Sequence, residues 1–275
     1  MKKISTLGPS GTFSELAVKK YKEAVNCEFD MKFYTTIAKA FNSIGKECEI
    51  GVIPIENSLD GFVQVSLDLL AQTKLKIICE VVVPVQFAFV SNVEDISKIE
   101  RVYAQFKTQG QCCAFLEKLD NAKIITTESN AESYDLAKGG KLGDSAIIPI
   151  HMLNDSNEFS LTIENVTDST DNKTRFIVLS KENLVNANED KYKTTIVVMD
   201  ALNKPGILAS ILNEFSDRNI NLSSIISRPT KKALGGYNFY MDIDGSYPQD
   251  ENVRQAILKI REHSVVKVLG SYNGY

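Results

Sequence analysis

The sequence predicts an α/β protein with two lobes, followed by a smaller C-terminal domain that has the ferredoxin-like order βαββαβ. Two patterns support this prediction. Short apolar runs alternate with helical patterns through the first 180 residues, and a strand–helix–strand–strand–helix–strand order follows residue 193. The length of 275 residues agrees with more than one domain, because a domain usually holds about 100 to 200 residues.

The first lobe opens with a repeated strand–helix pattern. We expect strands at Lys3–Leu7, Glu28–Tyr34 and Ile50–Ile53, and helices at Ser14–Tyr21, Thr36–Ile44 and near Val65–Gln72. The run Lys76–Val90 is too rich in β-branched residues for a helix, and Pro84 divides it into two strands. We interpret this run as a crossing between two lobes.

A second α/β set follows the crossing. We expect strands at Arg101–Ala104, Lys123–Thr127 and Ser145–Ile148, helices at Gln109–Leu119 and Ala131–Lys138, and a closing strand at Arg175–Leu179. The stretch Ser180–Lys193 is polar and rich in Asn and charge, so we expect few contacts to cross it. This places a first domain at 1–180, a linker at 181–193 and a C-terminal domain at 194–275.

The C-terminal domain has the clearest order of elements. We expect strands at Thr194–Met199, Ile220–Ser227, Tyr237–Ile243 and Val265–Leu269, helices at Pro205–Arg218 and Gln249–His263, and a hairpin through Gly235-Gly236. Pro205 suits the first position of a helix, and the apolar residues from Ile207 to Phe215 fall on one helix face.

Composition excludes several classes of protein. The formal charge is −4 and the pI is near 5.4, so no basic field exists to attract nucleic acid or anionic lipid. The longest apolar stretch, Lys74–Val90, contains charged residues and a proline, so we expect no membrane span. The N-terminus shows no signal segment, and the five cysteines lack paired spacings, which favours a cytoplasmic protein. With histidine only at His151 and His263, we expect no metal site.

Three polar segments are candidates for a functional site. Gly8–Thr12 leads a strand into a helix, where backbone N–H groups can meet an anion. Pro54–Gly61 follows an apolar strand, at the end where α/β proteins bind ligands. Asn172–Phe176 opens the last strand of the first domain and puts a hydroxyl beside a guanidinium. Taken singly, each segment is also compatible with a tight turn, a solvated loop or a strand edge.

Together and in this order, the three segments resemble the prephenate dehydratase family. Pro205–Leu208, Ile220–Leu222 and Ser227–Pro229 resemble the ACT regulatory module that follows the catalytic domain in that family. The resemblance covers nearly the whole chain. It implies a catalytic domain of two lobes, arranged like a periplasmic binding protein, that binds prephenate between them. The implied reaction converts prephenate to phenylpyruvate in L-phenylalanine biosynthesis and needs no cofactor.

The resemblance also implies roles for individual residues. Thr174 would donate to the departing hydroxyl, and Arg175 would grip a carboxylate of the substrate. The residues implied in substrate binding are Thr12, Ser14, Asn57, Ser58, Gln111 and Phe176, of which Phe176 would also pack the strand. L-phenylalanine is the implied effector, and the residues implied in binding it are Asn203, Gly206, Ile207, Leu208, Asn221, Leu222, Ser227, Arg228 and Pro229. We expect a homodimer or a dimer of dimers.

Three departures from the family pattern keep alternatives open. Many members carry a Ser-His-Pro-Gln run where this chain has Ala104-Gln105-Phe106-Lys107. The usual Ser-Thr-Ala element reads Ser129-Asn130-Ala131, and Ile226 stands where a glutamate is usual. One alternative is a prephenate decarboxylase-type paralogue, against which the retention of Thr174 argues. The other is a non-catalytic amino-acid sensor, whose support is the altered rim of the pocket.

Overall fold

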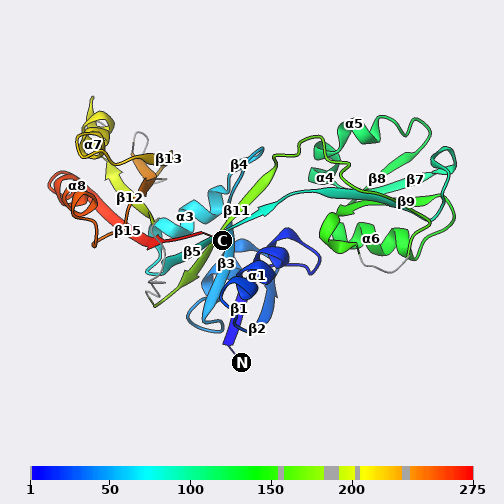
Figure 1. Ribbon diagram of the computed structural model, residues 1–275, viewed down its shortest axis with the longest axis horizontal. Coiled ribbons are helices and arrows are strands. Elements are labelled where there is room, and N and C mark those ends of the chain that lie inside the picture. The colour runs from blue at the N-terminus through cyan, green and yellow to red at the C-terminus, as the bar shows by residue number, and fades with distance from the viewer. Residues whose placement is uncertain (1, 154–157, 183–191, 202–204, 231–235, 275) are drawn as a thin grey trace.

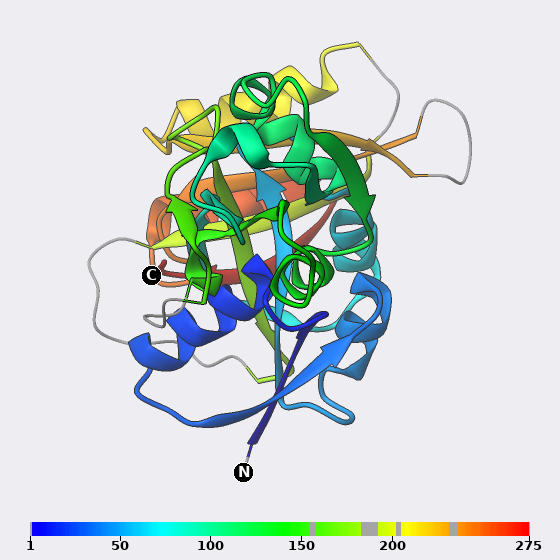
Figure 2. The same ribbon diagram turned by 90° about the vertical axis from the view of Figure 1, so that its right-hand side faces the viewer.

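The computed structural model describes residues 2–153, 158–182, 192–201, 205–230 and 236–274. Their strands form one sheet in each of three bodies (Figure 1). Lobe 1 comprises residues 2–84 and 173–182, lobe 2 comprises residues 87–163, and the C-terminal domain comprises the described residues from 192 to 274. Figure 2, seen from the side of lobe 2, shows lobe 1 projecting below it. The predicted fold class is confirmed.

Lobe 1 is a mixed sheet in the order β2-β1-β3-β11-β5, with β4 paired to β3. Its strands are β1 (Lys2–Leu7), β2 (Phe29–Tyr34), β3 (Ile50–Asn57), β4 (Gly61–Phe62), β5 (Lys76–Pro84) and β11 (Lys173–Ser180). Its helices are α1 (Phe13–Ala24), α2 (Ile37–Ser43) and α3 (Gln64–Gln72). Thr12 and Thr36 begin α1 and α2 as N-caps, since each side chain accepts a backbone N–H three residues later.

Lobe 2 is a mixed sheet in the order β10-β6-β9-β7-β8. Its strands are β6 (Phe87–Ser91), β7 (Arg101–Gln105), β8 (Lys123–Thr127), β9 (Asp144–Pro149) and β10 (Leu161–Ile163). Its helices are α4 (Phe106–Gln111), α5 (Cys113–Leu116) and α6 (Asn130–Lys138), with short 3₁₀ turns η1 (Ile96–Lys98) and η2 (Ile150–Met152). The predicted crossing is confirmed, because β5 belongs to lobe 1 and β6 to lobe 2. The chain returns to lobe 1 through β11, which lies antiparallel between β3 and β5.

The prediction of one helix over Gln109–Leu119 is wrong. The helical pattern breaks at Cys112, whose φ and ψ are −133° and 30°. The Asp168 carboxylate accepts the backbone N–H groups of Cys113 and Ala114 at 2.8 and 3.1 Å, and these are donors that a continuous helix would use. A contact from 55 residues away therefore divides the helix.

The C-terminal domain is an antiparallel sheet in the order β13-β14-β12-β15, with both helices packed on one face. Its elements are β12 (Lys193–Ala201), α7 (Ile207–Ser216), β13 (Leu222–Pro229), β14 (Tyr237–Asp244), α8 (Glu251–Arg261) and β15 (Val265–Tyr272). The prediction that Pro205 opens the first helix is wrong. Gly206 precedes the helix with a φ of +83°, a left-handed conformation that a regular helix excludes. Gly235 of the predicted hairpin lies outside the described residues.

The expectation that few contacts join the two domains is wrong. One hydrophobic core contains Leu67 and Leu70 of α3 together with Leu269 and Tyr272 of β15. Polar contacts cross the same interface: the Tyr240 hydroxyl donates to the Leu67 carbonyl at 2.7 Å. The predicted domain bounds themselves stay a prediction, because most of the 181–193 segment lies outside the described residues.

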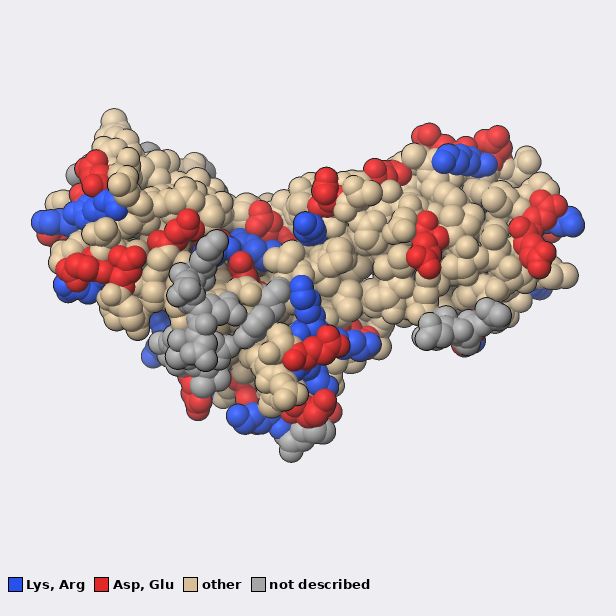
Figure 3. Space-filling view, in the orientation of Figure 1, with Lys and Arg blue, Asp and Glu red and all other residues tan. Residues whose placement is uncertain are grey.

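The distribution of surface charge agrees with the small net charge of the sequence. On the face drawn in Figure 3, Lys and Arg side chains alternate with Asp and Glu, without a large region of one sign. None of the described helices is both long and apolar enough to cross a membrane.

Candidate active site

The three polar segments meet at one edge of the lobe 1 sheet, toward lobe 2. β1 and β3 run parallel, so the loops that follow them leave the same edge. β11 runs antiparallel to β3 and begins at that edge, with Thr174 paired to Asn57. The lobes touch beside this edge, where the Phe13 ring lies 5.5 Å from the ring of Phe87 and 5.2 Å from that of His151.

Asn57 fixes the hydrogen bonding of Thr174. The Oδ1 atom of Asn57 accepts the backbone N–H groups of Leu59 and Asp60 at 3.0 and 2.9 Å. These two donors set the orientation of the amide, so its Nδ2 group faces β11 and donates to Thr174 Oγ1 at 3.0 Å. Since the Thr174 oxygen is an acceptor in this contact, its own O–H proton is directed to another partner.

Asn172 opens the candidate segment Asn172–Phe176, but no role was predicted for its side chain from the sequence. Its side chain is fully buried, and its Oδ1 atom accepts from Asn57 Nδ2 at 2.8 Å and from Ser58 Oγ at 3.4 Å. Its Nδ2 group donates to Gln111 Oε1 in lobe 2 at 3.1 Å. Asn172 therefore joins the predicted residues of both lobes to Thr174. The sequence signal that could have identified Asn172 was its position two residues before Thr174 in the same short motif.

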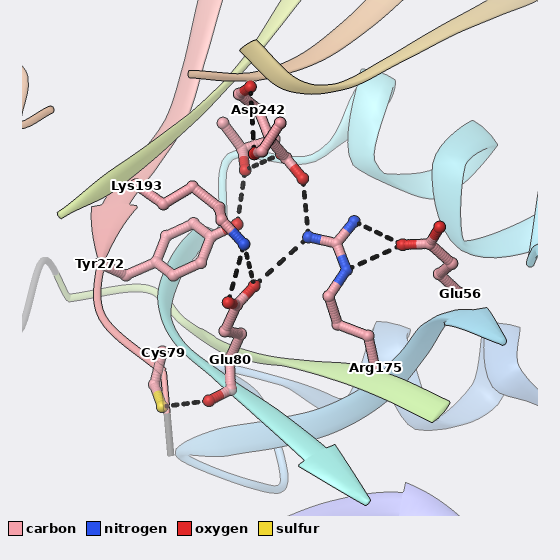
Figure 4. Close-up of polar contacts among 9 residues, drawn as sticks. Glu56, Cys79, Glu80, Arg175, Lys193, Asp242 and Tyr272 are labelled. Carbon is pink, nitrogen blue, oxygen red and sulfur yellow. Dashed lines mark hydrogen bonds and ion pairs between the residues drawn. The ribbon is translucent and has the colours of Figure 1, made fainter. Parts of the chain in front are cut away.

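Arg175 does not lie with Thr174, although the two residues are adjacent. Successive residues of a strand point to opposite faces, and the Arg175 guanidinium lies among side chains of lobe 1 and the C-terminal domain. It forms ion pairs with Glu56, Glu80 and Asp242 at 3.1, 3.3 and 2.7 Å (Figure 4). These contacts count against the expectation that Arg175 grips a carboxylate of the substrate, because the guanidinium is occupied by carboxylates of the protein. That expected role stays a prediction.

Phe176 lies in the core of lobe 1 and is 1% exposed. This position agrees with the expectation that it packs the strand, but it leaves no surface for contact with a substrate. Its burial counts against the expected role of Phe176 in substrate binding, which stays a prediction.

The Gly8–Thr12 turn holds a carboxylate of its own chain. The Ser10 hydroxyl and the Gly11 amide both donate to Glu15 Oε2 at 2.6 Å, and the Lys19 ammonium pairs with Glu15 at 2.8 Å. Burial raises the pKa of the Glu15 carboxyl, but these hydrogen bonds outweigh burial and bring the pKa to about 2. The Thr12 hydroxyl donates to the Pro9 carbonyl, and Ser14 is buried at the start of α1.

Glu15→Gln is expected to destabilise the protein by about 1 to 3 kcal/mol at pH 7, because an amide replaces a charged acceptor. The folded pKa lies below the ordinary value of 4.5, so the stabilisation is complete above that value and is lost as the pH falls toward 2. Urea unfolding at pH 7 and pH 3 measures this difference, with exposed Glu28→Gln as the control. An equal loss at both pH values would show that the charge of Glu15 is irrelevant.

The segment that replaces the family's Ser-His-Pro-Gln run reaches across the cleft. The Gln105 side chain caps α4 by accepting the Lys107 N–H at 2.7 Å. The Lys107 ammonium pairs with Asp60, in the turn that follows Asn57, at 2.9 Å. Beside this pair lies a cavity of about 580 Å³, lined by Asp60, Phe106, Lys107, Gln111, Leu116 and Ile124. The cavity has the size of a site for a small ligand.

The residues implied in effector binding divide into two groups within one chain. Gly206, Ile207 and Leu208 lie at the start of α7, and Ser227, Arg228 and Pro229 form the end of β13. Asn221 and Leu222 lie at the opposite end of β13, where the Asn221 amide donates to Asp244 at 3.0 Å. Arg228 is paired with Asp68 of α3 by two contacts of 2.8 Å. Asn203 lies outside the described residues.

Comparisons with known proteins agree with this arrangement. The profile of the family described as prephenate dehydratase matches residues 4–184, and the profile of the ACT domain matches residues 194–262. The chain is 32% identical over 268 residues to the prephenate dehydratase of Methanocaldococcus jannaschii, which covers 96% of this chain and 95% of that relative. It is 31% identical to the bifunctional chorismate mutase/prephenate dehydratase of Aquifex aeolicus, which covers 98% of this chain and 73% of that relative.

Solved structures give the same result. The prephenate dehydratase of Arthrobacter aurescens, solved in complex with L-Phe, superposes with a TM-score of 0.85 at 31% identity and covers 98% of this chain and 90% of its own. The prephenate dehydratase of Staphylococcus aureus superposes with a TM-score of 0.82 at 27% identity, covering 98% of this chain and 100% of its own. The chain therefore belongs to the prephenate dehydratase family of hydro-lyases, acts in phenylalanine biosynthesis, and carries an ACT regulatory domain after its catalytic domain.

Proposed function

We propose that Thr174 donates the hydrogen bond and the proton that remove the hydroxyl group of prephenate, and that Asn57 orients it. The observation that carries this proposal is the 3.0 Å contact in which Asn57 Nδ2 donates to Thr174 Oγ1. Because the Thr174 oxygen is the acceptor in this contact, the Thr174 hydroxyl can donate its own proton to a partner in the cleft. Asn172 supports the orientation, because it accepts from Asn57 and donates to Gln111 across the lobes.

The chemistry needs a donor at the departing oxygen. The ring of prephenate carries a carboxylate and, on the opposite carbon, a hydroxyl group. As the bond to the carboxylate breaks, CO2 departs and its electron pair enters the ring, and the carbon–oxygen bond breaks at the other end. The oxygen takes a proton and leaves as water, so prephenate and one proton give phenylpyruvate, CO2 and water. A threonine hydroxyl is a very weak acid, so Thr174 acts in a network that stabilises charge as the bond breaks.

A product balance tests the proposed reaction. Purified full-length chain is incubated with prephenate labelled with ¹⁸O in the ring hydroxyl, and CO2, labelled water and phenylpyruvate are quantified. Equal amounts of the three products support dehydration. Release of CO2 with the label kept in a non-aromatic keto acid would support a decarboxylase instead, and unchanged prephenate would support an amino-acid sensor without catalysis.

For the ACT domain we propose L-phenylalanine as the effector. The support is that the Arthrobacter aurescens relative was solved with L-Phe and that this chain keeps Pro205–Leu208 and Ser227–Pro229. β13 is the edge strand of its sheet, so a second copy can pair with it. Antiparallel pairing would bring Asn221 of one copy toward Ser227–Pro229 of the other, and this supports a homodimer or a dimer of dimers.

Gly206→Val is expected to weaken phenylalanine inhibition by about tenfold or more, within the usual range of allosteric coupling. The φ of Gly206 is +83°, which a β-branched residue adopts only with strain, and among the described residues no atom lies within 4 Å of the place where a Cβ would stand. The variant is therefore expected to displace the start of α7 through backbone strain. Inhibition curves for the variant and for exposed Leu258→Ala measure the effect. A folded Gly206→Val protein with the inhibition of the wild type would contradict the proposed site.

The compartment also stays a proposal. The sequence favours the cytoplasm, because its five cysteines are odd in number and lack the short paired spacings of a disulfide framework.

A further inference from the structure

A buried ion network joins the regulatory domain to the strand that carries Thr174. Figure 4 shows the Arg175 guanidinium between Glu56 on one side and Glu80 with Asp242 on the other. Glu56 and Glu80 come from β3 and β5, the neighbours of β11 in lobe 1, whereas Asp242 comes from β14 of the ACT domain. The Arg175 side chain is 14% exposed and that of Asp242 is 7% exposed. The contact to Asp242, at 2.7 Å, is the shortest of the three.

The ACT domain holds Asp242 in place. The Thr195 hydroxyl donates to Asp242 Oδ1 at 2.5 Å, and a second contact of 2.6 Å joins the hydroxyls of Thr195 and Tyr272. Lys193 of β12 reaches both oxygens of Glu80 at 2.8 and 2.9 Å. The network thus contains three carboxylates and two cations, and both domains contribute to it. A charge left unpaired in such a buried place is costly.

The first residues of β11 lie between this network and the candidate site. β11 pairs with β5 without a shift from Lys173 to Val178, whereas its register with β3 shifts between Arg175 and Phe176, where Ile55 of β3 is the extra residue. Thr174 and Arg175 are neighbours on β11 whose side chains point to opposite faces, so the contact with Asn57 lies on one face and the Arg175 network on the other. A change in the contacts of Arg175 therefore acts on the same stretch of backbone that carries Thr174.

We propose that Asp242 of the ACT domain is a positioning residue for the reaction, acting through Arg175 on Thr174. Asp242 fixes the position of the guanidinium through their ion pair, and the guanidinium restrains the stretch of β11 to which Arg175 belongs. The conformation of that stretch sets the direction in which the Thr174 hydroxyl points. The inference rests on the proposed role of Thr174. It gives the regulatory domain a direct part in the geometry of the catalytic site.

The test compares two variants of β14 in the full-length protein. Asp242→Asn keeps the size of the side chain but removes its charge, and it is expected to lower kcat about tenfold or more while the KM for prephenate stays within about threefold. Tyr240→Phe is the matched control. Tyr240 lies two residues earlier on the same strand and face, and the variant loses one hydrogen bond to lobe 1 without touching Arg175. Its kcat is expected to stay within about twofold.

A second arm tests whether Asp242 acts through Arg175. If it does, the double variant Arg175→Met, Asp242→Asn has the same kcat as Arg175→Met alone. If Asp242→Asn fails to fold, Thr195→Val replaces it, since that variant removes the hydroxyl that contacts Asp242 and Tyr272 and leaves both charges of the Asp242–Arg175 pair in place. Its kcat is expected to fall about threefold.

Two results would overturn the inference. One is a folded Asp242→Asn protein with the kcat of the wild type, and the other is a double variant in which the two losses multiply. Failure of the proposed role of Thr174 is seen separately, because Thr174→Ala would then keep its turnover whatever Asp242→Asn does.

Discussion

Thr174→Ala is expected to lower kcat by about 10² to 10³ or more, while the KM for prephenate changes only a few-fold. The hydroxyl serves an oxygen that gains negative charge as its bond to the ring breaks, so its contribution arises mainly in the transition state. The protein should keep its stability, because the side chain is half-buried and Asn57 keeps its contacts to Asn172 and the Lys173 carbonyl. Steady-state formation of phenylpyruvate measures kcat and KM.

Thr174→Ser is the matched control. It keeps the donor and loses one methyl group, so it should retain part of the turnover that Thr174→Ala loses. A Thr174→Ala protein with the kcat of the wild type would show that another group donates to the departing oxygen.

Asn57→Asp is expected to lower kcat nearly as much as Thr174→Ala, by about 10². A carboxylate at this position still accepts the N–H groups of Leu59 and Asp60, so the turn is kept. It has no N–H to give to Thr174, however. The Thr174 hydroxyl must then donate to the new carboxylate, which turns its proton away from the substrate. The loss should therefore appear in kcat, as for Thr174→Ala.

Asn252→Asp makes the same chemical change at the start of α8, far from Thr174 in the sequence and in a different domain, and should leave kcat within about twofold. The two Asn variants are compared by the same steady-state assay, with thermal unfolding to show that both are folded. An Asn57→Asp protein with more than half of the kcat of the wild type would contradict the proposed orientation of Thr174.

The fold was largely accessible from the sequence because its elements follow local patterns. The alternation of apolar runs and helical patterns predicted the two lobes, and Pro84 marked the crossing between β5 and β6. Contacts between residues that are distant in the sequence could not be predicted from local patterns. Asp168 interrupts the helix at Cys112, and the ACT domain packs on α3, and neither contact has a local signal in the sequence.

The site divides in the same way. The motifs pointed to Asn57 and Thr174, and the pairing of β3 with β11 brings the two together. Side chains alternate between the two faces of a strand, so the sequence could have placed Arg175 on the face opposite to Thr174. It could not predict the carboxylate partners of Arg175, because they come from three separate strands. Asn172 gains its role from being buried between Asn57 and Gln111, which depends on how the two lobes meet.

The central claim is that the Thr174 hydroxyl donates to the departing oxygen of prephenate. The most direct measurement is a crystal structure of the full-length wild type with a prephenate analogue whose ring is saturated, so that it keeps the hydroxyl and cannot become aromatic. We expect Thr174 Oγ1 at about 2.6 to 3.0 Å from the ring hydroxyl, with Asn57 Nδ2 still donating to Thr174. A bound analogue whose hydroxyl lies more than about 4 Å from Thr174, beyond hydrogen-bond reach, would contradict the account.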